Sequence, residues 1–135
     1  MRSRSLVAGE DVHVKALGRD RGEVPAARRF VRGVLAGRPA AGDAEPLACE
    51  LVTNAVMHAD GSGQVRLGAV AGGEGVHVEV ADAGTAGVPA WREPAAGAES
   101  GRGFQLVDEI ATRWGFMRDQ AGTCCWFDLD DSQAL

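Results

Sequence analysis

Hydrophobic and polar residues alternate, or recur at helical spacing, in distinct blocks along the chain, and each block predicts one element. Within residues 10–17, Val12 and Val14 alternate with polar neighbours, which predicts a half-buried strand with the valines on its apolar face. Apolar residues then recur at helical spacing after Pro25, and Gly37 ends the run. Because proline suits the first turn of a helix and glycine its end, we expect a helix between them.

A second helical pattern occupies residues 44–58, and Asp43 is expected to cap its N-terminus. Its apolar residues fall on one side of the helix and are expected to enter the core; they are Leu47, Leu51, Val52 and Ala55.

Two further blocks predict hairpins. Residues 65–80 alternate valine, leucine or alanine with other residues on both sides of a glycine-rich turn, which predicts a hairpin with one buried face. A second hairpin is expected to turn at Asp119–Gly122, and the polar tail of residues 130–135 is expected to fray. Between the hairpins, residues 83–100 show no period, and a helix is expected after Gly103.

This order of elements, strand, helix, helix, hairpin, loop, helix and hairpin, predicts an α+β fold. We expect a two-layer sandwich in which a mixed, mostly antiparallel sheet is covered on one face by about three helices. At 135 residues the chain is expected to form a single domain, residues 1–135, with its core at about 8–130.

Composition and charge narrow the classes of function. The formal net charge is −5, with acidic and basic residues intermixed, which argues against direct binding to nucleic acid. No apolar run has the length of a membrane span, and the basic N-terminus lacks the apolar stretch of a signal peptide, so no membrane association is expected. The three cysteines show no zinc-ligand spacing and are expected to be reduced thiols in a cytoplasmic protein.

Within the second predicted helix, Glu50, Asn54 and His58 are spaced four residues apart and form a polar stripe. The carbonyl oxygen of Asn54 is the hard kind of ligand that Mg²⁺ prefers. Glu50, one turn earlier, can accept a proton from a hydroxyl that attacks a γ-phosphate. The alternative for the Glu50 and Asn54 pair is an exposed helix face. For His58, a role as a C-terminal cap or in packing is favoured over catalysis.

Two glycine-containing motifs follow in the chain. Asp82 ends an apolar strand and precedes Gly84; its carboxylate can accept a hydrogen bond from the exocyclic amine of adenine, whereas guanine offers an acceptor there. The alternative is an ordinary turn aspartate. Gly101 and Gly103 open a predicted helix, whose free N–H groups favour phosphate. Arg102 between them points either to phosphate or to solvent.

Taken in order, the segments Glu50–His58, Asp82–Gly84 and Gly101–Val107 resemble the three nucleotide-binding boxes of the GHKL ATPase superfamily. Within it, the chain is most similar to the small anti-sigma-factor serine/threonine kinases of bacteria. The resemblance covers roughly residues 20–129 and implies the Bergerat-type variant of the sandwich. Residues 85–100 would then be a flexible ATP lid.

The resemblance also implies roles for individual residues. The family uses the residue matching Glu50 as the base and the residue matching Asn54 as the Mg²⁺ ligand. Asp82 and Gly84 would form the adenine end of an ATP site, with Thr123 beside the base. Gly101, Arg102 and Gly103 would lie at the phosphates of ATP.

A protein serine/threonine kinase is therefore implied, which phosphorylates an anti-sigma antagonist and sequesters a sigma factor. A homodimer is expected from the resemblance alone. The alternative function is a non-catalytic regulatory module that uses ATP or ADP as a conformational ligand, or binds no nucleotide. A histidine-kinase catalytic domain fits less well, because no predicted helix carries a phosphoacceptor histidine, and gyrase-like or chaperone-like ATPases need further domains.

Overall fold

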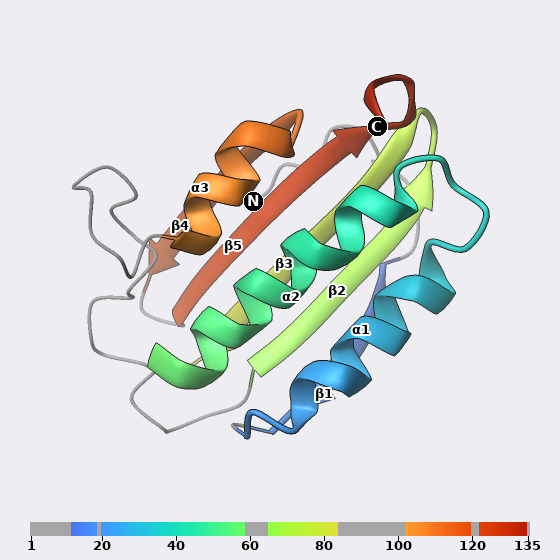
Figure 1. Ribbon diagram of the computed structural model, residues 1–135. Helices are drawn as coiled ribbons and strands as arrows, with labels where there is room; N and C mark the ends of the chain where they lie inside the picture. The colour runs from blue at the N-terminus through green and yellow to red at the C-terminus, as the bar shows by residue number, and fades with distance from the viewer. Residues whose placement is uncertain (1–11, 19, 59–64, 84–101, 120–121, 135) are drawn as a thin grey trace.

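A computed structural model describes residues 12–18, 20–58, 65–83, 102–119 and 122–134. Within these ranges, five strands form one sheet in the order β1-β2-β3-β5-β4, and α1, α2 and α3 all lie over the same face of it (Figure 1). In chain order the elements are β1 (His13–Leu17), α1 (Glu23–Val34), α2 (Ala41–His58), β2 (Val65–Gly72), β3 (Gly75–Ala83), α3 (Arg102–Ile110), β4 (Arg113–Asp119), β5 (Gly122–Asp130) and the short helical turn η2 (Asp131–Gln133). The α+β sandwich expected from the sequence is confirmed.

All four strand pairings are antiparallel. The expected mixture of parallel and antiparallel pairs is therefore not seen among the described strands. The pairs β2–β3 and β4–β5 are consecutive in the chain and correspond to the two predicted hairpins. Antiparallel neighbours of this kind can be joined by a tight turn.

The core lies between the helices and the covered face of the sheet. Val76, Val78 and Val80 of β3 are fully buried, as are Leu47 and Leu51 of α2, which confirms the predicted core faces of both elements. Burying such side chains stabilises the fold by about 1.5–3 kcal/mol each.

The prediction for the face of β1 is wrong. Val12 and Val14 are 39% and 58% exposed, whereas Leu17 is 2% exposed and joins the core. The register explains this, because Leu17 pairs with Val65 of the covered face, while Val14 pairs with Gly68 on the other face. In an edge strand with apolar residues on both faces, alternation alone does not choose between them.

The start of α2 also differs from the prediction. The helix begins at Ala41, so Asp43 lies in its first turn and is not the N-cap. The acidic partner at this end comes from far along the chain: the backbone N–H of Ala40 donates to Asp131 Oδ1 at 3.1 Å. A carboxylate at a helix N-terminus complements both the free N–H groups and the helix dipole.

Asp131 also anchors the tail that was expected to fray, so that prediction is wrong through residue 134. Its Oδ2 lies 2.7 Å from Arg38 Nη2, and its N–H donates to the carbonyl of Glu74. Arg38 Nη2 further donates to the carbonyls of Gly73 at 3.0 Å and Gly75 at 3.4 Å. One guanidinium thus joins the α1–α2 connection, the β2–β3 turn and η2.

We expect Arg38→Ala to lower the free energy of unfolding by about 2 kcal/mol, because it removes charged hydrogen bonds at a half-buried site. Urea unfolding followed by circular dichroism measures this. Arg32→Ala is the matched control: Arg32 bonds Glu45 from a side chain that is 62% exposed, so its loss should cost no more than about 1 kcal/mol. Equal losses in the two variants would contradict the anchoring role of Arg38.

Gly75 shows a second close approach in the same region. A Cβ at this position would lie 2.2 Å from the carbonyl oxygen of Leu129 on β5. Since backbone cannot yield as a flexible side chain does, only glycine allows β3 and β5 to pair through this point.

Gly75→Ala is therefore expected to destabilise the protein by about 2 kcal/mol or more. Gly33→Ala serves as the opposite-sign control, because a Cβ at Gly33 in α1 meets nothing within 4 Å. Alanine favours the helix there by about 0.5–1 kcal/mol. Thermal melting of both variants should show shifts of opposite sign; a Gly75→Ala protein as stable as the wild type would contradict the steric argument.

Candidate nucleotide site at one end of the sheet

The predicted site residues come from four elements that end or begin at the same end of the molecule. The C-terminal end of α2, the end of β3 and the beginnings of α3 and β5 meet there (Figure 1). This arrangement follows from the topology, because β3 and β5 are antiparallel neighbours. Residues that are far apart in the sequence are therefore brought to one edge of the two layers.

Glu50 and Asn54 lie one turn apart on α2, as the sequence predicted. Asn54 is 9% exposed, whereas Glu50 is only half-buried. Their helix is held down by Leu51 and Ala55, which are buried against the sheet. The half-buried carboxylate therefore remains within reach of a second molecule.

Among the predicted site side chains that the structure describes, Asp82 is the most buried, with 4% exposure. It lies on the helix-covered face of β3, in the same row as Val78 and Val80. Its carboxylate therefore occupies a position at which the apolar pattern of the strand predicts another core residue. Across the sheet, Asp82 is the Cα partner of Thr123 on β5. The register thus pairs the two positions that the family resemblance implies lie at the adenine.

The glycine-rich motif coincides with a helix start, as predicted: α3 begins at Arg102, followed by Gly103. Gly84, Gly101 and the predicted lid, residues 85–100, lie outside the described residues, as do the side chains of Arg102 and Thr123. His58 is the last residue of α2, and its side chain is likewise outside the described part.

The Asn54 amide provides an observation on whether these residues fit a nucleotide and a metal. Its Nδ2 is buried and has no hydrogen-bond partner among the described residues. Leaving a buried donor unpaired costs about 1–3 kcal/mol, so such a group is typical of a site that a ligand completes. The amide nitrogen suits a phosphate oxygen and the amide oxygen suits Mg²⁺. Asn54 therefore has the donor and the acceptor that a nucleotide phosphate and its Mg²⁺ ion would require.

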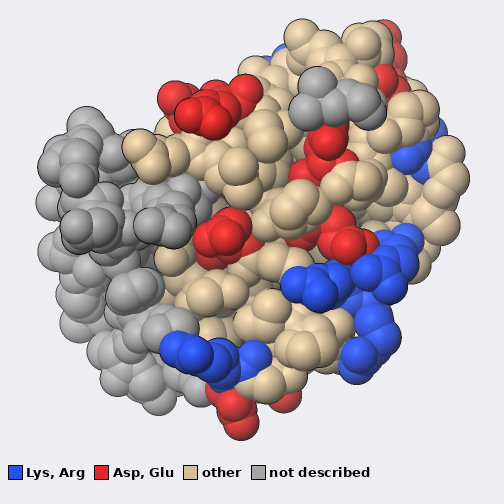
Figure 2. Space-filling view, in the orientation of Figure 1, with Lys and Arg blue, Asp and Glu red and all other residues tan. Residues whose placement is uncertain are grey.

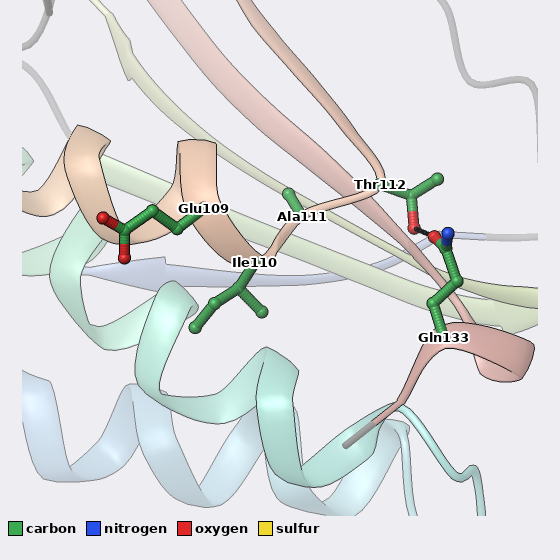
Figure 3. Close-up of a pocket in the computed structure, with 5 residues that line it drawn as sticks. All are labelled: Glu109, Ile110, Ala111, Thr112 and Gln133. Atoms are coloured by element: carbon green, nitrogen blue, oxygen red, sulfur yellow. Dashed lines mark hydrogen bonds between the residues drawn. The ribbon is translucent and has the colours of Figure 1, made fainter.

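A separate hollow lies at the other end of α3. It measures about 300 Å³ and is lined by Glu109, Ile110, Ala111, Thr112 and Gln133 (Figure 3). The Thr112 hydroxyl donates to Gln133 Oε1 at 2.7 Å along one side of it. Since it is one whole helix length away from Arg102, this hollow is distinct from the candidate nucleotide site.

Charges on the helical face are mixed. Figure 2 shows basic side chains gathered over α1 at the lower right, with acidic side chains spread over α2 and α3. Arg32 of α1 and Glu45 of α2 form a two-bond pair, at 2.8 Å and 3.1 Å. The hydrogen bond from Arg32 lowers the pKa of Glu45. The pair joins two helices but lies outside the candidate site.

The comparison with protein families decides the class of the chain. The model of the histidine kinase-like ATPase domain matches residues 19–129. The chain belongs to the histidine kinase-like ATPase family. A search of curated proteins gave no match. As a member of this family, the chain is an ATP-binding domain of the kinase-like ATPase type, in agreement with the broader part of the sequence prediction.

The described part of this histidine kinase-like ATPase domain contains no helix that is long and apolar enough to cross a membrane.

Sequence reasoning missed one polar cluster, which lies on the other face of the sheet around His77 and Asp128. The available signal was a polar residue at every second position in both strands, His77 and Glu79 in β3 and Asp128 and Asp130 in β5.

If Asp82 accepts from adenine, Mg-ATP should bind and Mg-GTP should not. Asp82→Ala should then weaken Mg-ATP binding about 10- to 100-fold, the value of a hydrogen bond to a charged group. Isothermal titration calorimetry of the folded variants measures this. Glu74→Ala is the control, since Glu74 is an exposed acid in the turn before β3, at the other end of that strand. Unchanged ATP affinity in a folded Asp82→Ala protein would refute the adenine assignment.

Proposed function

We propose that this chain is an ATP-dependent serine/threonine protein kinase of the anti-sigma-factor type. The observation that carries the proposal is the pairing on α2 of a half-buried carboxylate, Glu50, with a buried amide, Asn54, whose Nδ2 is unpaired among the described residues. An acid and a neutral oxygen ligand one helical turn apart suit proton removal beside a metal-bound phosphate.

In the proposed reaction, Glu50 accepts the proton of a serine or threonine hydroxyl on a protein substrate. The hydroxyl oxygen bonds to the γ-phosphorus of ATP, the bond from that phosphorus to the bridging oxygen breaks, and ADP leaves. Asn54 would hold Mg²⁺, which neutralises charge on the phosphates when bound. Asp82 would accept a hydrogen bond from the adenine, and the N–H groups at the N-terminus of α3 would bind the phosphates.

The proposed substrate is an anti-sigma antagonist, and the proposed second partner is a sigma factor that the chain sequesters. Both follow from the sequence resemblance to the anti-sigma-factor kinases. The half-buried position of Glu50 supports a protein substrate, because the carboxylate is open to an approaching side chain.

The proposal is tested with Glu50→Ala. We expect this variant to bind Mg-ATP with wild-type affinity but to lose at least about 100-fold in the rate of phosphotransfer, the contribution typical of a general base. The assay follows transfer of a labelled γ-phosphate to purified antagonist proteins encoded in the same genome.

Glu45→Ala is the matched control, because Glu45 lies on the same helix but pairs with Arg32 of α1. It should retain both binding and transfer. Undiminished transfer by Glu50→Ala would refute the base assignment. ATP binding without any transfer by the wild type would instead favour the non-catalytic regulatory module.

A further inference from the structure

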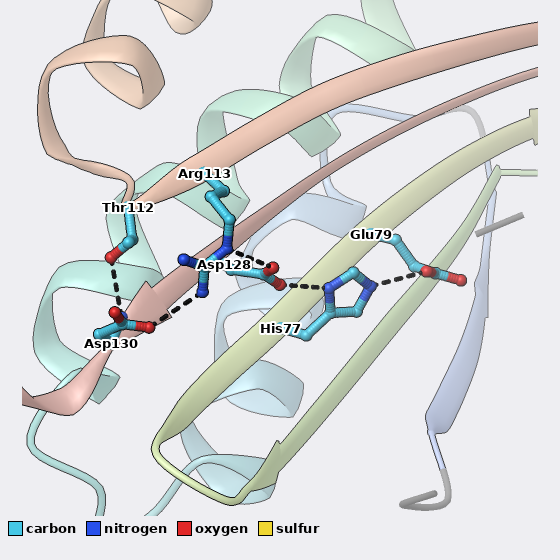
Figure 4. A network of polar contacts seen from close by, with 6 residues as sticks. All are labelled: His77, Glu79, Thr112, Arg113, Asp128 and Asp130. Atoms are coloured by element: carbon cyan, nitrogen blue, oxygen red, sulfur yellow. Dashed lines mark hydrogen bonds and ion pairs between the residues drawn. The ribbon is translucent and has the colours of Figure 1, made fainter. Parts of the chain in front are cut away.

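A charged cluster lies on the face of the sheet opposite the helices. Its centre is His77 of β3, whose Cα partner on β5 is Asp128, and Glu79 follows two positions along β3 (Figure 4). Both His77 and Asp128 have side chains that are only 1% exposed. A histidine and a carboxylate are therefore both removed from solvent at the middle of the sheet, away from the candidate nucleotide site.

The distances from the two ring nitrogens to their neighbours indicate which protonation state of His77 the site favours. Nδ1 of His77 lies 2.6 Å from Asp128 Oδ1, and Nε2 lies 2.9 Å from Glu79 Oε1. Ionised carboxylates only accept hydrogen bonds, and a neutral imidazole has only one N–H to donate. Both contacts are satisfied together when both ring nitrogens carry protons, so the arrangement selects the imidazolium form.

The pKa of His77 agrees in direction with this geometry. Burial by itself lowers the pKa, but the hydrogen bonds to Asp128 and Glu79, together with their charges, outweigh burial and raise it above the ordinary value. The short charged bond to Asp128 is typical of an ionised donor with an ionised acceptor.

Among the described residues, two further charged side chains lie beside this cluster, Arg113 and Asp130. Arg113 of β4 reaches Asp128 Oδ2 with Nε at 3.4 Å and Asp130 Oδ1 with Nη2 at 3.1 Å. With His77 protonated, these two cations face the three carboxylates of Glu79, Asp128 and Asp130. From β2, the residue opposite His77 is the uncharged Val70.

Trp126 adds a neutral contact on β5. Its ring stacks on His77 with a centroid distance of 6.0 Å and an interplanar angle of 29°. A cation over an indole face is stabilised by the ring's electron density, which again favours the imidazolium form.

We propose that His77 acts as a proton-dependent clamp between β3 and β5, which holds the two central strands together while its ring is charged. Loss of one ring proton removes one of the two hydrogen bonds that His77 donates to these carboxylates, and it removes the positive charge beside the buried Asp128. The stabilisation is therefore fully present below the unfolded pKa of about 6.5, and is lost as pH rises through the higher pKa of the folded state.

The first test is a nuclear magnetic resonance titration of the wild-type chain, which reads both ring nitrogens of each histidine. His77 is assigned with the help of His13→Gln and His58→Gln, which remove the other two histidines. We expect both nitrogens of His77 to carry protons at about pH 7, with a midpoint above the ordinary value of about 6.5. A neutral His77 at that pH would overturn the proposal, and this measurement does not depend on any substitution at His77.

The second test compares melting temperatures between about pH 6 and about pH 9 for the wild type, His77→Gln and His13→Gln. Glutamine can donate to one carboxylate but carries no charge. We expect His77→Gln to melt roughly 5 °C or more below the wild type at the acidic end, with the gap narrowing as pH rises.

His13→Gln is the control, because His13 is exposed on β1 and lies outside the cluster. It should melt in parallel with the wild type over the whole range. A gap for His77→Gln that does not change with pH would mean that the ring packs without acting as a clamp. Nucleotide binding is not part of either readout, so these results do not depend on the proposed kinase function.

Discussion

The antiparallel register between β3 and β5 is the constraint on which the rest of the structure depends. Alternate residues of β3 face opposite sides of the sheet, so the register assigns Val78 and Val80 to the core and His77 to the outer face at once. The same pairing sets Asp82 beside Thr123. A slip of one residue would move valines out of the core and a histidine into it. Burial of the valines thus also fixes the faces of the sheet on which His77 and Asp82 lie.

Much of this fold was predictable because its main elements carry their own periodicity. The second helix and the first hairpin were correctly predicted, since each has a clean apolar face. β1 was not, because it carries Leu17 on one face and valines on the other, and only pairing with β2 decides which is buried. Local pattern settles the element but not its orientation when both faces are apolar.

Long-range polar contacts were beyond the sequence. Ala40 and Asp131 are separated by 91 positions, and His77 and Asp128 by 51. In neither pair does the sequence around one residue indicate which distant residue it will contact. The candidate site was more accessible to prediction, because the spacing of Glu50 and Asn54 follows from helix geometry. That Asp82 lies at the same end of the molecule could be expected only when the motifs were considered together, and the roles of these residues stay predictions.

The two faces of the sheet use charge differently. On the helix side, Asp82 stands at the end of an otherwise apolar row, and Asn54 is buried with a donor that no described residue satisfies. On the other side, His77 and its carboxylates satisfy one another within the protein. A self-satisfied cluster favours rigidity, whereas an incomplete one favours the arrival of a ligand. Within the described residues, one face of the sheet thus carries a polar cluster that is satisfied inside the protein, whereas Asn54, on a helix that covers the other face, carries a donor that a ligand can satisfy.

The strand order carries a consequence for biosynthesis. β5 follows β4 in the chain but is inserted between β3 and β4 in the sheet. Until β5 has left the ribosome, β3 has an unpaired edge and its valine row has no neighbour on that side. Exposed edges of this kind invite pairing with other chains. The sheet can therefore be completed only after synthesis has passed Asp130. In a nascent chain that stops before β5, the exposed edge of β3 can pair with strands of other chains.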